Sequence, residues 1–133
     1  MDLNGKKIVV VGMGKTGIAS AGFLGKKGAK VTVIDEKSPD LWGVEFERIA
    51  RENWLEIGDY RSVDTLEGAS MIVPSPGIPP DNALLVEAQK KNIPVVSEIE
   101  LAYRFIKVPI IAVTGTNGKT TTTTLLGKIL QEL

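Results

Sequence analysis

A lysine flanked by glycines and hydroxyl side chains occurs between Gly115 and Thr121, where the chain reads GTNGKTT. A β-branched, apolar run, Pro109–Val113, precedes it. In a loop of this kind the backbone amides face phosphate oxygens, the lysine adds a point charge, and the hydroxyl after the lysine reaches a magnesium ion. We therefore predict that a nucleoside triphosphate binds at Gly115, Thr116, Asn117, Gly118, Lys119, Thr120 and Thr121.

This loop differs from the strict pattern G-x-x-x-x-G-K-[ST], which requires glycine where the chain has Val113. A glycine-rich turn that only caps an ordinary helix is the alternative interpretation. Two features favour the phosphate-binding loop. One is the preceding strand-like run, and the other is a helix-compatible set of apolar residues after the loop, Leu125, Leu126, Ile129 and Leu130.

A second glycine-rich loop, Gly12–Gly17, reads GMGKTG and has the spacing G-x-G-x-x-G. It follows a predicted strand and opens a predicted helix, so that a diphosphate could bind at the helix N-terminus. Asp35 ends the next strand, where a carboxylate can accept a hydrogen bond from a ribose or a base edge. Alone, these residues are typical of a nicotinamide dehydrogenase, and a purely structural turn is a further alternative. Lys15 and Thr16 are the candidates to face a ligand.

A third loop, Pro74–Pro80, reads PSPGIPP and follows a short apolar run, so it is a stiff turn at the carboxyl end of a strand. In an open α/β sheet, ligands bind along that edge. A rigid connector without a ligand explains the prolines equally well on residue chemistry alone.

Strands and helices alternate along the chain, with short loops between them. The pattern predicts strands at Lys7–Val11, Lys30–Ile34, Leu55–Ile57, Met71–Val73 and Pro94–Val96. It predicts helices over Thr16–Lys27, Val44–Asn53 and Asn82–Lys91, the first ended by Gly28 and the last capped by Asp81. A further helix opens at Ser97 and has an apolar face formed by Ile99, Ala102, Tyr103 and Ile106. This alternation predicts an α/β fold, a Rossmann-like, doubly wound parallel sheet.

The composition excludes several classes of protein. The 133 residues carry 16 basic and 16 acidic side chains, so a nucleic-acid-binding surface is not indicated. Cysteine and histidine are absent, which excludes disulfides and a His/Cys metal site. No apolar run has the length of a signal peptide core or a membrane span, so we expect no membrane partner and a cytoplasmic location.

Together and in this order, the motifs resemble the N-terminal part of the Mur ligase family, most closely its D-glutamate-adding members. The resemblance covers essentially the whole chain and is carried by GMGKTG (12–17), VIDEK (33–37), SPGIP (75–79), SEIEL (97–101) and GTNGKTT (115–121). The L-alanine-adding members, which are the alternative within the family, typically have histidine at the position of Asn117. The other Mur ligases and the folylpolyglutamate synthetases lack such a first domain.

The resemblance implies an ATP-dependent ligase of peptidoglycan precursor synthesis. ATP phosphorylates the carboxylate of UDP-N-acetylmuramoyl-L-alanine, and D-glutamate then attacks the acyl phosphate. It implies that the UDP end binds at Gly14, Lys15, Thr16, Gly17, Asp35, Glu36, Lys37, Ser75, Pro76 and Gly77. The family often has a hydroxyl and an arginine where this chain has Glu36 and Lys37. It further implies that Gly115–Thr121 binds the ATP phosphates, with Lys119 catalytic and Thr120 near Mg²⁺.

The resemblance also divides the chain. We expect a UDP-substrate-binding domain over residues 1–107 and the start of an ATP-binding domain, namely its first strand, P-loop and helix, over residues 108–133.

We expect no ligase activity from this piece alone, because the remaining catalytic groups lie elsewhere in the family fold. We expect the apolar tail to fold back on the first domain or to contact a neighbouring chain, as in a dimer. Two other hypotheses are an NAD(P)-binding oxidoreductase domain, which leaves the P-loop without a role, and a stand-alone nucleotide-binding module.

Overall fold

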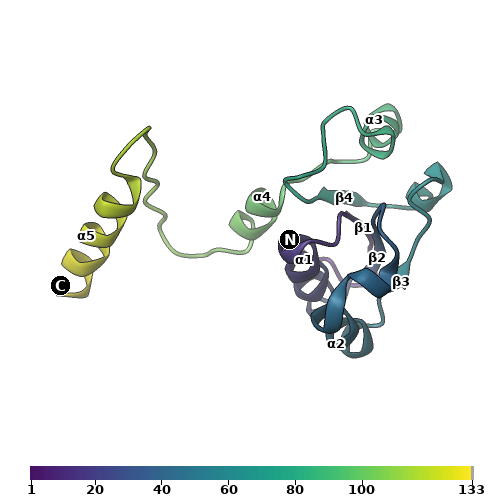
Figure 1. The fold of residues 1–133 in the computed structure, drawn as a ribbon, viewed down its shortest axis with the longest axis horizontal. Coiled ribbons are helices and arrows are strands. Elements are labelled where there is room, and N and C mark those ends of the chain that lie inside the picture. The colour runs from purple at the N-terminus through teal and green to yellow at the C-terminus, as the bar shows by residue number, and fades with distance from the viewer. Residues whose placement is uncertain (133) are drawn as a thin grey trace.

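The computed structural model describes residues 1–132. Within them, four parallel strands form one sheet in the order β3-β2-β1-β4 (Figure 1). The strands are β1 (Lys7–Val11), β2 (Lys30–Ile34), β3 (Glu56–Ile57) and β4 (Met71–Pro74). Both inner strands are almost entirely buried, as expected when helices cover both faces of a parallel sheet.

The helices cover the two faces of this sheet unequally. They are α1 (Lys15–Lys26), α2 (Gly43–Asn53), α3 (Ala83–Lys90), α4 (Glu98–Tyr103) and α5 (Lys119–Gln131), with short 3₁₀ helices at Pro39–Leu41 and Val63–Leu66. Helices α1, α2 and α4 pack on the face that carries Ile8 and Val10. Helix α3 and the second 3₁₀ helix pack on the face that carries Val9 and Val11. This arrangement confirms the predicted doubly wound sheet.

The small residues of α1 pack against both the sheet and helix α2. Ile18 and Ala21 face the sheet, whereas Gly22 and Gly25 lie against Ile49 and Asn53 of α2. A side chain at Gly25 would collide with Asn53, so this face allows two helices to pack closely on one side of the sheet. The predicted role of Gly28 is confirmed, because its φ of +80° ends the helix in a left-handed conformation.

Helix α3 begins one residue later than predicted, and its cap is Asn82 rather than Asp81. The Asn82 side chain accepts a hydrogen bond from the Leu84 amide at 3.0 Å and donates one to the Tyr60 hydroxyl at 2.9 Å. The bond to Tyr60 explains why Asn82 rather than Asp81 is the cap, because it joins the start of α3 to a residue 22 positions earlier in the chain. A sequence pattern cannot display that contact.

We expect Asn82→Ala to lower the free energy of unfolding by about 1–2 kcal/mol, through loss of the cap and of the bond to Tyr60. The matched control is Asp81→Ala, because Asp81 is exposed and lies outside the helix. Its expected change is below about 0.5 kcal/mol. Urea denaturation of the two variants measures both values. A larger loss in Asp81→Ala would contradict this assignment of the cap.

The segment before α4 and the face of α4 itself differ from prediction. Pro94–Val96 forms only an isolated bridge between Val95 and Ile72. Ser97 does cap α4, since its hydroxyl accepts a hydrogen bond from the Glu100 amide at 3.1 Å. The predicted apolar face is nevertheless not the side that packs inward, because Ile99 and Tyr103 are 75% and 64% exposed, whereas the buried residue is Leu101.

The tail after α4 extends away from the sheet, and α5 stands apart from the rest of the fold (Figure 1). Ile110–Val113 forms no strand, because no other strand within residues 1–132 lies beside it. Of the two alternatives predicted for the tail, folding back on the first domain is wrong, whereas contact with a neighbouring chain stays a prediction. Leu125, Ile129 and Leu130 are all more than half exposed, while Leu133 lies outside the described residues. Helix α5 is present after the loop, where the apolar residues Leu125, Leu126, Ile129 and Leu130 indicated a helix. No helix among residues 1–132 is long and apolar enough to cross a bilayer.

Candidate functional site

The candidate site lies at the carboxyl edge of the sheet, where the strand order reverses. Strand β1 pairs with β2 on one side and with β4 on the other, all in parallel. The chain therefore leaves the sheet in different directions after β1 and after β4, and a crevice between such loops is where ligands bind in open α/β sheets. The loops Gly12–Gly17 and Ser75–Gly77 follow β1 and β4 at that edge.

Backbone contacts join these two loops tightly. The Ser75 hydroxyl donates a hydrogen bond to the Gly12 carbonyl oxygen at 2.8 Å, and the Ser75 amide donates to the Val11 carbonyl at 2.8 Å. A β-carbon at Gly17 would overlap the same Gly12 carbonyl oxygen, so glycine is required where α1 approaches the end of β1. Gly12 itself has a φ of +91°. The first and last of the predicted glycines thus serve packing and turn geometry.

Asp35 connects the loop after β2 to the loop after β1. Its carboxylate accepts hydrogen bonds from the Met13 amide and from the Lys37 amide, the latter at 2.8 Å. The side chain is half-buried, so part of the carboxylate still faces solvent. A carboxylate offers about four lone-pair sites, and these two bonds leave room for a ligand hydroxyl or N–H. Asp35 therefore both holds the glycine loop and remains able to bind.

The other predicted residues surround these contacts with open surface. Gly14, Lys15, Thr16, Glu36, Lys37, Pro76 and Gly77 are all exposed. A β-carbon at Gly14 or Gly77 would meet no atom within 4 Å, so a ligand can approach the backbone at both positions. The structure thus brings the predicted loops after β1, β2 and β4 together at one edge of the sheet.

The Gly115–Thr121 loop opens α5 with a geometry that suits phosphate. Gly118 has a φ of +77° and stands directly before the helix, whose first residues are exposed. The Lys119 ammonium donates a hydrogen bond to the Gly115 carbonyl, so the side chain curls back over its own loop. Amides at a helix N-terminus, an ammonium and adjacent hydroxyls are a suitable set of donors for a triphosphate with Mg²⁺. The residues present therefore fit ATP.

The two loop systems do not meet in this structure. The tail places the Gly115–Thr121 loop far from the carboxyl edge of the sheet (Figure 1). Among residues 1–132, moreover, no group of three or more acidic, histidine or cysteine side chains could hold a metal ion. The Gly115–Thr121 loop itself carries three hydroxyl side chains, those of Thr116, Thr120 and Thr121.

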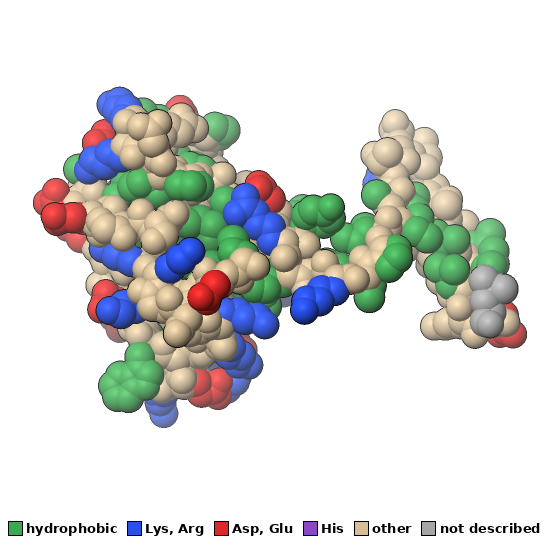
Figure 2. Space-filling model, turned by 180° about the vertical axis from the view of Figure 1, so that it is seen from behind, with side chains coloured by type: hydrophobic (Ala, Val, Ile, Leu, Met, Phe, Trp, Pro, Cys, Tyr) green, Lys and Arg blue, Asp and Glu red, His purple; other side chains and the backbone are tan. Residues whose placement is uncertain are grey.

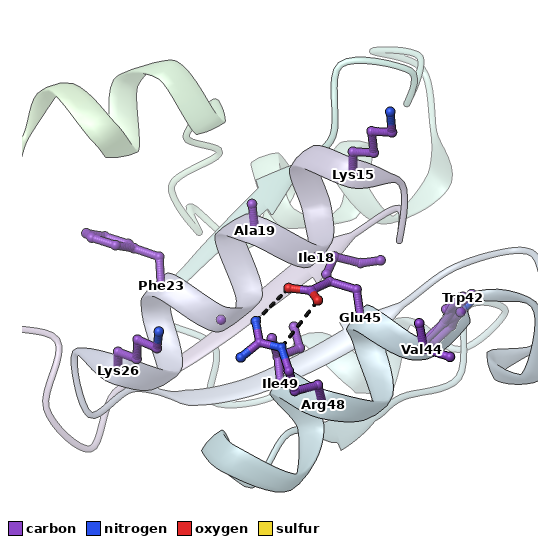
Figure 3. Close-up of a pocket in the computed structure, with 12 residues that line it drawn as sticks. Lys15, Ile18, Ala19, Phe23, Lys26, Trp42, Val44, Glu45, Arg48 and Ile49 are labelled. Atoms are coloured by element: carbon purple, nitrogen blue, oxygen red, sulfur yellow. Dashed lines mark hydrogen bonds and ion pairs between the residues drawn. The ribbon is translucent and has the colours of Figure 1, made fainter.

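A groove that the sequence did not predict lies between α1 and α2, with a volume of about 650 Å³ (Figure 3). Its floor is apolar, and Arg48 forms ion pairs with Glu45 at 2.6 Å and with Glu52 at 2.9 Å at its rim. Hydrogen bonding by the Arg48 guanidinium lowers the pKa of Glu45 below its usual range. The spacing i, i+3 and i+4 along α2 is the sequence signal for these pairs. Because all three side chains are largely exposed, the pairs contribute little to stability.

The family comparison covers most of the chain. The family described as "Mur ligase MurD-like, N-terminal domain" matches residues 6–97. A UDP-N-acetylmuramoylalanine–D-glutamate ligase of Syntrophus aciditrophicus is 48% identical over 132 residues, which are 98% of this chain and 29% of that protein. A ligase of the same name from Caldicellulosiruptor saccharolyticus is 47% identical over 136 residues, which are 100% of this chain and 30% of that protein. The chain thus spans less than a third of the length of these relatives.

Solved structures support the fold. A murein peptide ligase from Psychrobacter arcticus has a TM-score of 0.65 at 23% identity, over 96% of this chain and 26% of that one. The D-lactate dehydrogenase of Escherichia coli has a TM-score of 0.53 at 22% identity, over 73% of this chain and 29% of that one. Because a ligase and a dehydrogenase share this sheet, structural similarity alone does not separate their functions. The family match over residues 6–97 shows that the chain belongs to the MurD-like Mur ligases, of which it carries the N-terminal domain.

Proposed function

We propose that this chain is the N-terminal part of an ATP-dependent ligase that adds D-glutamate to UDP-N-acetylmuramoyl-L-alanine. The observation that carries the proposal is 48% identity, over nearly the whole chain, to a protein named for that product. Residues 1–107 form the domain that binds the UDP end of the substrate, and residues 108–133 begin the ATP-binding domain. A reaction that consumes ATP and a UDP-linked precursor takes place in the cytoplasm.

In the proposed reaction, ATP supplies the phosphoryl group that activates the muramoyl carboxylate, and the amine of D-glutamate then displaces phosphate from the acyl phosphate. The part of this chain is to bind and to orient. The amides at the start of α5 hold phosphate oxygens, Lys119 offsets their charge, and the Thr120 hydroxyl is a ligand for Mg²⁺. Lys119 must exchange its hydrogen bond to the Gly115 carbonyl for one to phosphate.

The UDP end binds in the crevice between the loops after β1 and β4. Gly14–Gly17 offers an exposed helix N-terminus, and Gly77 offers open backbone opposite it. Asp35 accepts a hydrogen bond from the uridine, with its carboxylate already oriented by the Met13 and Lys37 amides. Lys15, Thr16, Glu36, Lys37, Ser75 and Pro76 line the same opening. Because Ser75 fixes the distance between the two loops, the crevice is preorganised.

We expect Asp35→Ala to weaken binding of UDP-N-acetylmuramoyl-L-alanine by about 10- to 100-fold, since a charged acceptor is lost and its loop loosens. We expect Thr16→Ala to weaken it by about three- to tenfold. Isothermal titration of the purified chain measures both dissociation constants, with the exposed Asp81→Ala as the control. Wild-type affinity in both Asp35→Ala and Thr16→Ala would disprove the assigned site.

The oxidoreductase alternative keeps one specific observation in its favour, because a carboxylate at the end of β2 is also where dehydrogenases hold a ribose. Titrating NADH and UDP-N-acetylmuramoyl-L-alanine side by side separates the two functions. We expect binding of the UDP ligand alone. A second measurement separates this ligase from the L-alanine-adding members. In the full-length protein we expect ATP-dependent release of phosphate when D-glutamate is added, and none when L-alanine is added instead.

We also propose that residues 1–133 release no phosphate by themselves, since activation of the carboxylate needs groups from more than one domain.

A further inference from the structure

Helix α4 is apolar on both sides. On its inner side Leu101 is 2% exposed, and the following Phe105 packs edge-on against Phe23 of α1 with ring centroids 5.1 Å apart. The Lys27 ammonium lies 5.4 Å from the centroids of both rings. The inner side is thus firmly attached to α1. The outer side carries Ile99 and Tyr103, and Ile106 follows three residues after the helix; these three residues are called the outer face of α4.

The outer face of α4 is exposed and continues into the segment after it. Its three side chains are 75%, 64% and 46% exposed. Together with Ile110 they line a hollow of about 460 Å³, and Val108 beside it is 69% exposed. Figure 2 shows apolar side chains along the arm that leads from the compact part to α5. Apolar side chains gathered on one exposed surface in this way mark an interaction site.

The position of this face in the chain indicates what covers it. The family match to the N-terminal domain ends at residue 97, one residue before α4 begins. The phosphate-binding loop starts at Gly115, and the relatives are more than three times as long as this chain. The outer face therefore lies between one domain and the start of the next. The Glu100–Arg104 ion pair gives it the charged border that is typical of an interface rim.

We propose that the outer face of α4 is the surface on which the ATP-binding domain of the full-length chain docks. This inference rests on the proposed function, which assigns residues 108–133 to that domain. With Phe105 held on α1 and the outer face held on the second domain, α4 sets the distance between the Gly12–Gly17 loop and the Gly115–Thr121 loop. The two loops are far apart in the structure of residues 1–132, and catalysis needs one reacting centre (Figure 1).

The test uses the full-length protein with Ile99→Asp and Tyr103→Asp, singly and together. The control is Trp54→Asp, because Trp54 is 89% exposed and follows α2, away from α4. Two quantities are measured: the rate of tryptic cleavage after Lys107 and the kcat of the ligase. We expect the double variant to be cleaved at least about tenfold faster and to lose at least about tenfold in kcat. We expect the dissociation constant for UDP-N-acetylmuramoyl-L-alanine to change less than about twofold.

Several results would overturn the proposal. One is cleavage and kcat in the double variant equal to those of Trp54→Asp. Another is a wild-type dimer that the double variant abolishes without faster cleavage, because a second copy would then cover the face. If the double variant unfolds, Ile99→Ser and Tyr103→Ser replace it, and equality with the control again overturns the proposal. Faster cleavage in a full-length protein that has no ligase activity would instead support docking and refute the proposed function.

Discussion

Replacing Lys119 with alanine in the full-length ligase will lower kcat by about 10²- to 10³-fold. The Lys119 ammonium is the single positive charge in the Gly115–Thr121 loop, and phosphoryl transfer concentrates negative charge there. In the structure the ammonium already sits over the loop, bound to the Gly115 carbonyl, which is where we propose that phosphate binds. Phosphate release that depends on both D-glutamate and the muramoyl substrate measures the effect.

The matched control for this prediction is Lys128→Ala. Lys128 lies on the same helix and is exposed, but it is close to the opposite end. We expect less than a twofold change in kcat from it, at the level of ordinary surface substitutions. Affinity of the first domain for UDP-N-acetylmuramoyl-L-alanine should stay at the wild-type value in both variants, because the loop lies outside the UDP crevice. A Lys119→Ala enzyme with wild-type kcat would refute the catalytic role of this lysine.

The second large effect concerns stability. Gly17→Ala will lower the free energy of unfolding of the first domain by at least about 3 kcal/mol. The new methyl group would overlap the Gly12 carbonyl oxygen and press on the Ser75 hydroxyl. The first of these is a backbone atom, and the second is held by its hydrogen bond to that same carbonyl. Neither can move aside without opening the contact between β1 and α1. Because Ser75 would move as well, the UDP crevice would be disturbed together with the fold.

Gly14→Ala is the control, since it belongs to the same glycine motif. A β-carbon at Gly14 meets no atom within 4 Å, and its φ of −74° suits alanine. The expected stability loss is below about 1 kcal/mol and reflects only a poorer helix cap. Urea denaturation monitored by far-UV circular dichroism compares the two midpoints. Equal midpoints for Gly17→Ala and Gly14→Ala would show that the packing role assigned to Gly17 is wrong.

The elements of the first domain were predictable because their signals are local. Buried strands such as Lys7–Val11 read as continuous β-branched runs, and Gly28 marks the end of α1. Three predicted loops follow strands of one parallel sheet, and such strands present their carboxyl ends at a common edge. The position of the candidate UDP site could therefore be inferred from the sequence alone, as could the helix after Gly118.

Other features depend on which elements meet. Asp35 was expected to face a ligand, and the fold shows that it also accepts the Met13 and Lys37 amides. The cap of α3 is Asn82 rather than the predicted Asp81, because the Asn82 side chain also bonds to Tyr60. The side of α4 that packs inward could not be predicted, because apolar residues lie on two sides of this helix, Leu101 on one and Ile99 and Tyr103 on the other. In the fold, Leu101 is the residue of α4 that lies in the core cluster with the buried residues of α1.

The sequence by itself determined the order of strands and helices, the three strand-following loops and the lysine-containing loop, because each depends on side chains close together in the chain. Only the tertiary structure decided which glycines are required by packing, which carboxylate oxygens are already bonded, and which side of α4 stays open. It also decided that Ile110–Val113 forms no strand within residues 1–132. A β-strand needs a partner for its backbone hydrogen bonds, and residues distant in the chain or on another chain must supply it.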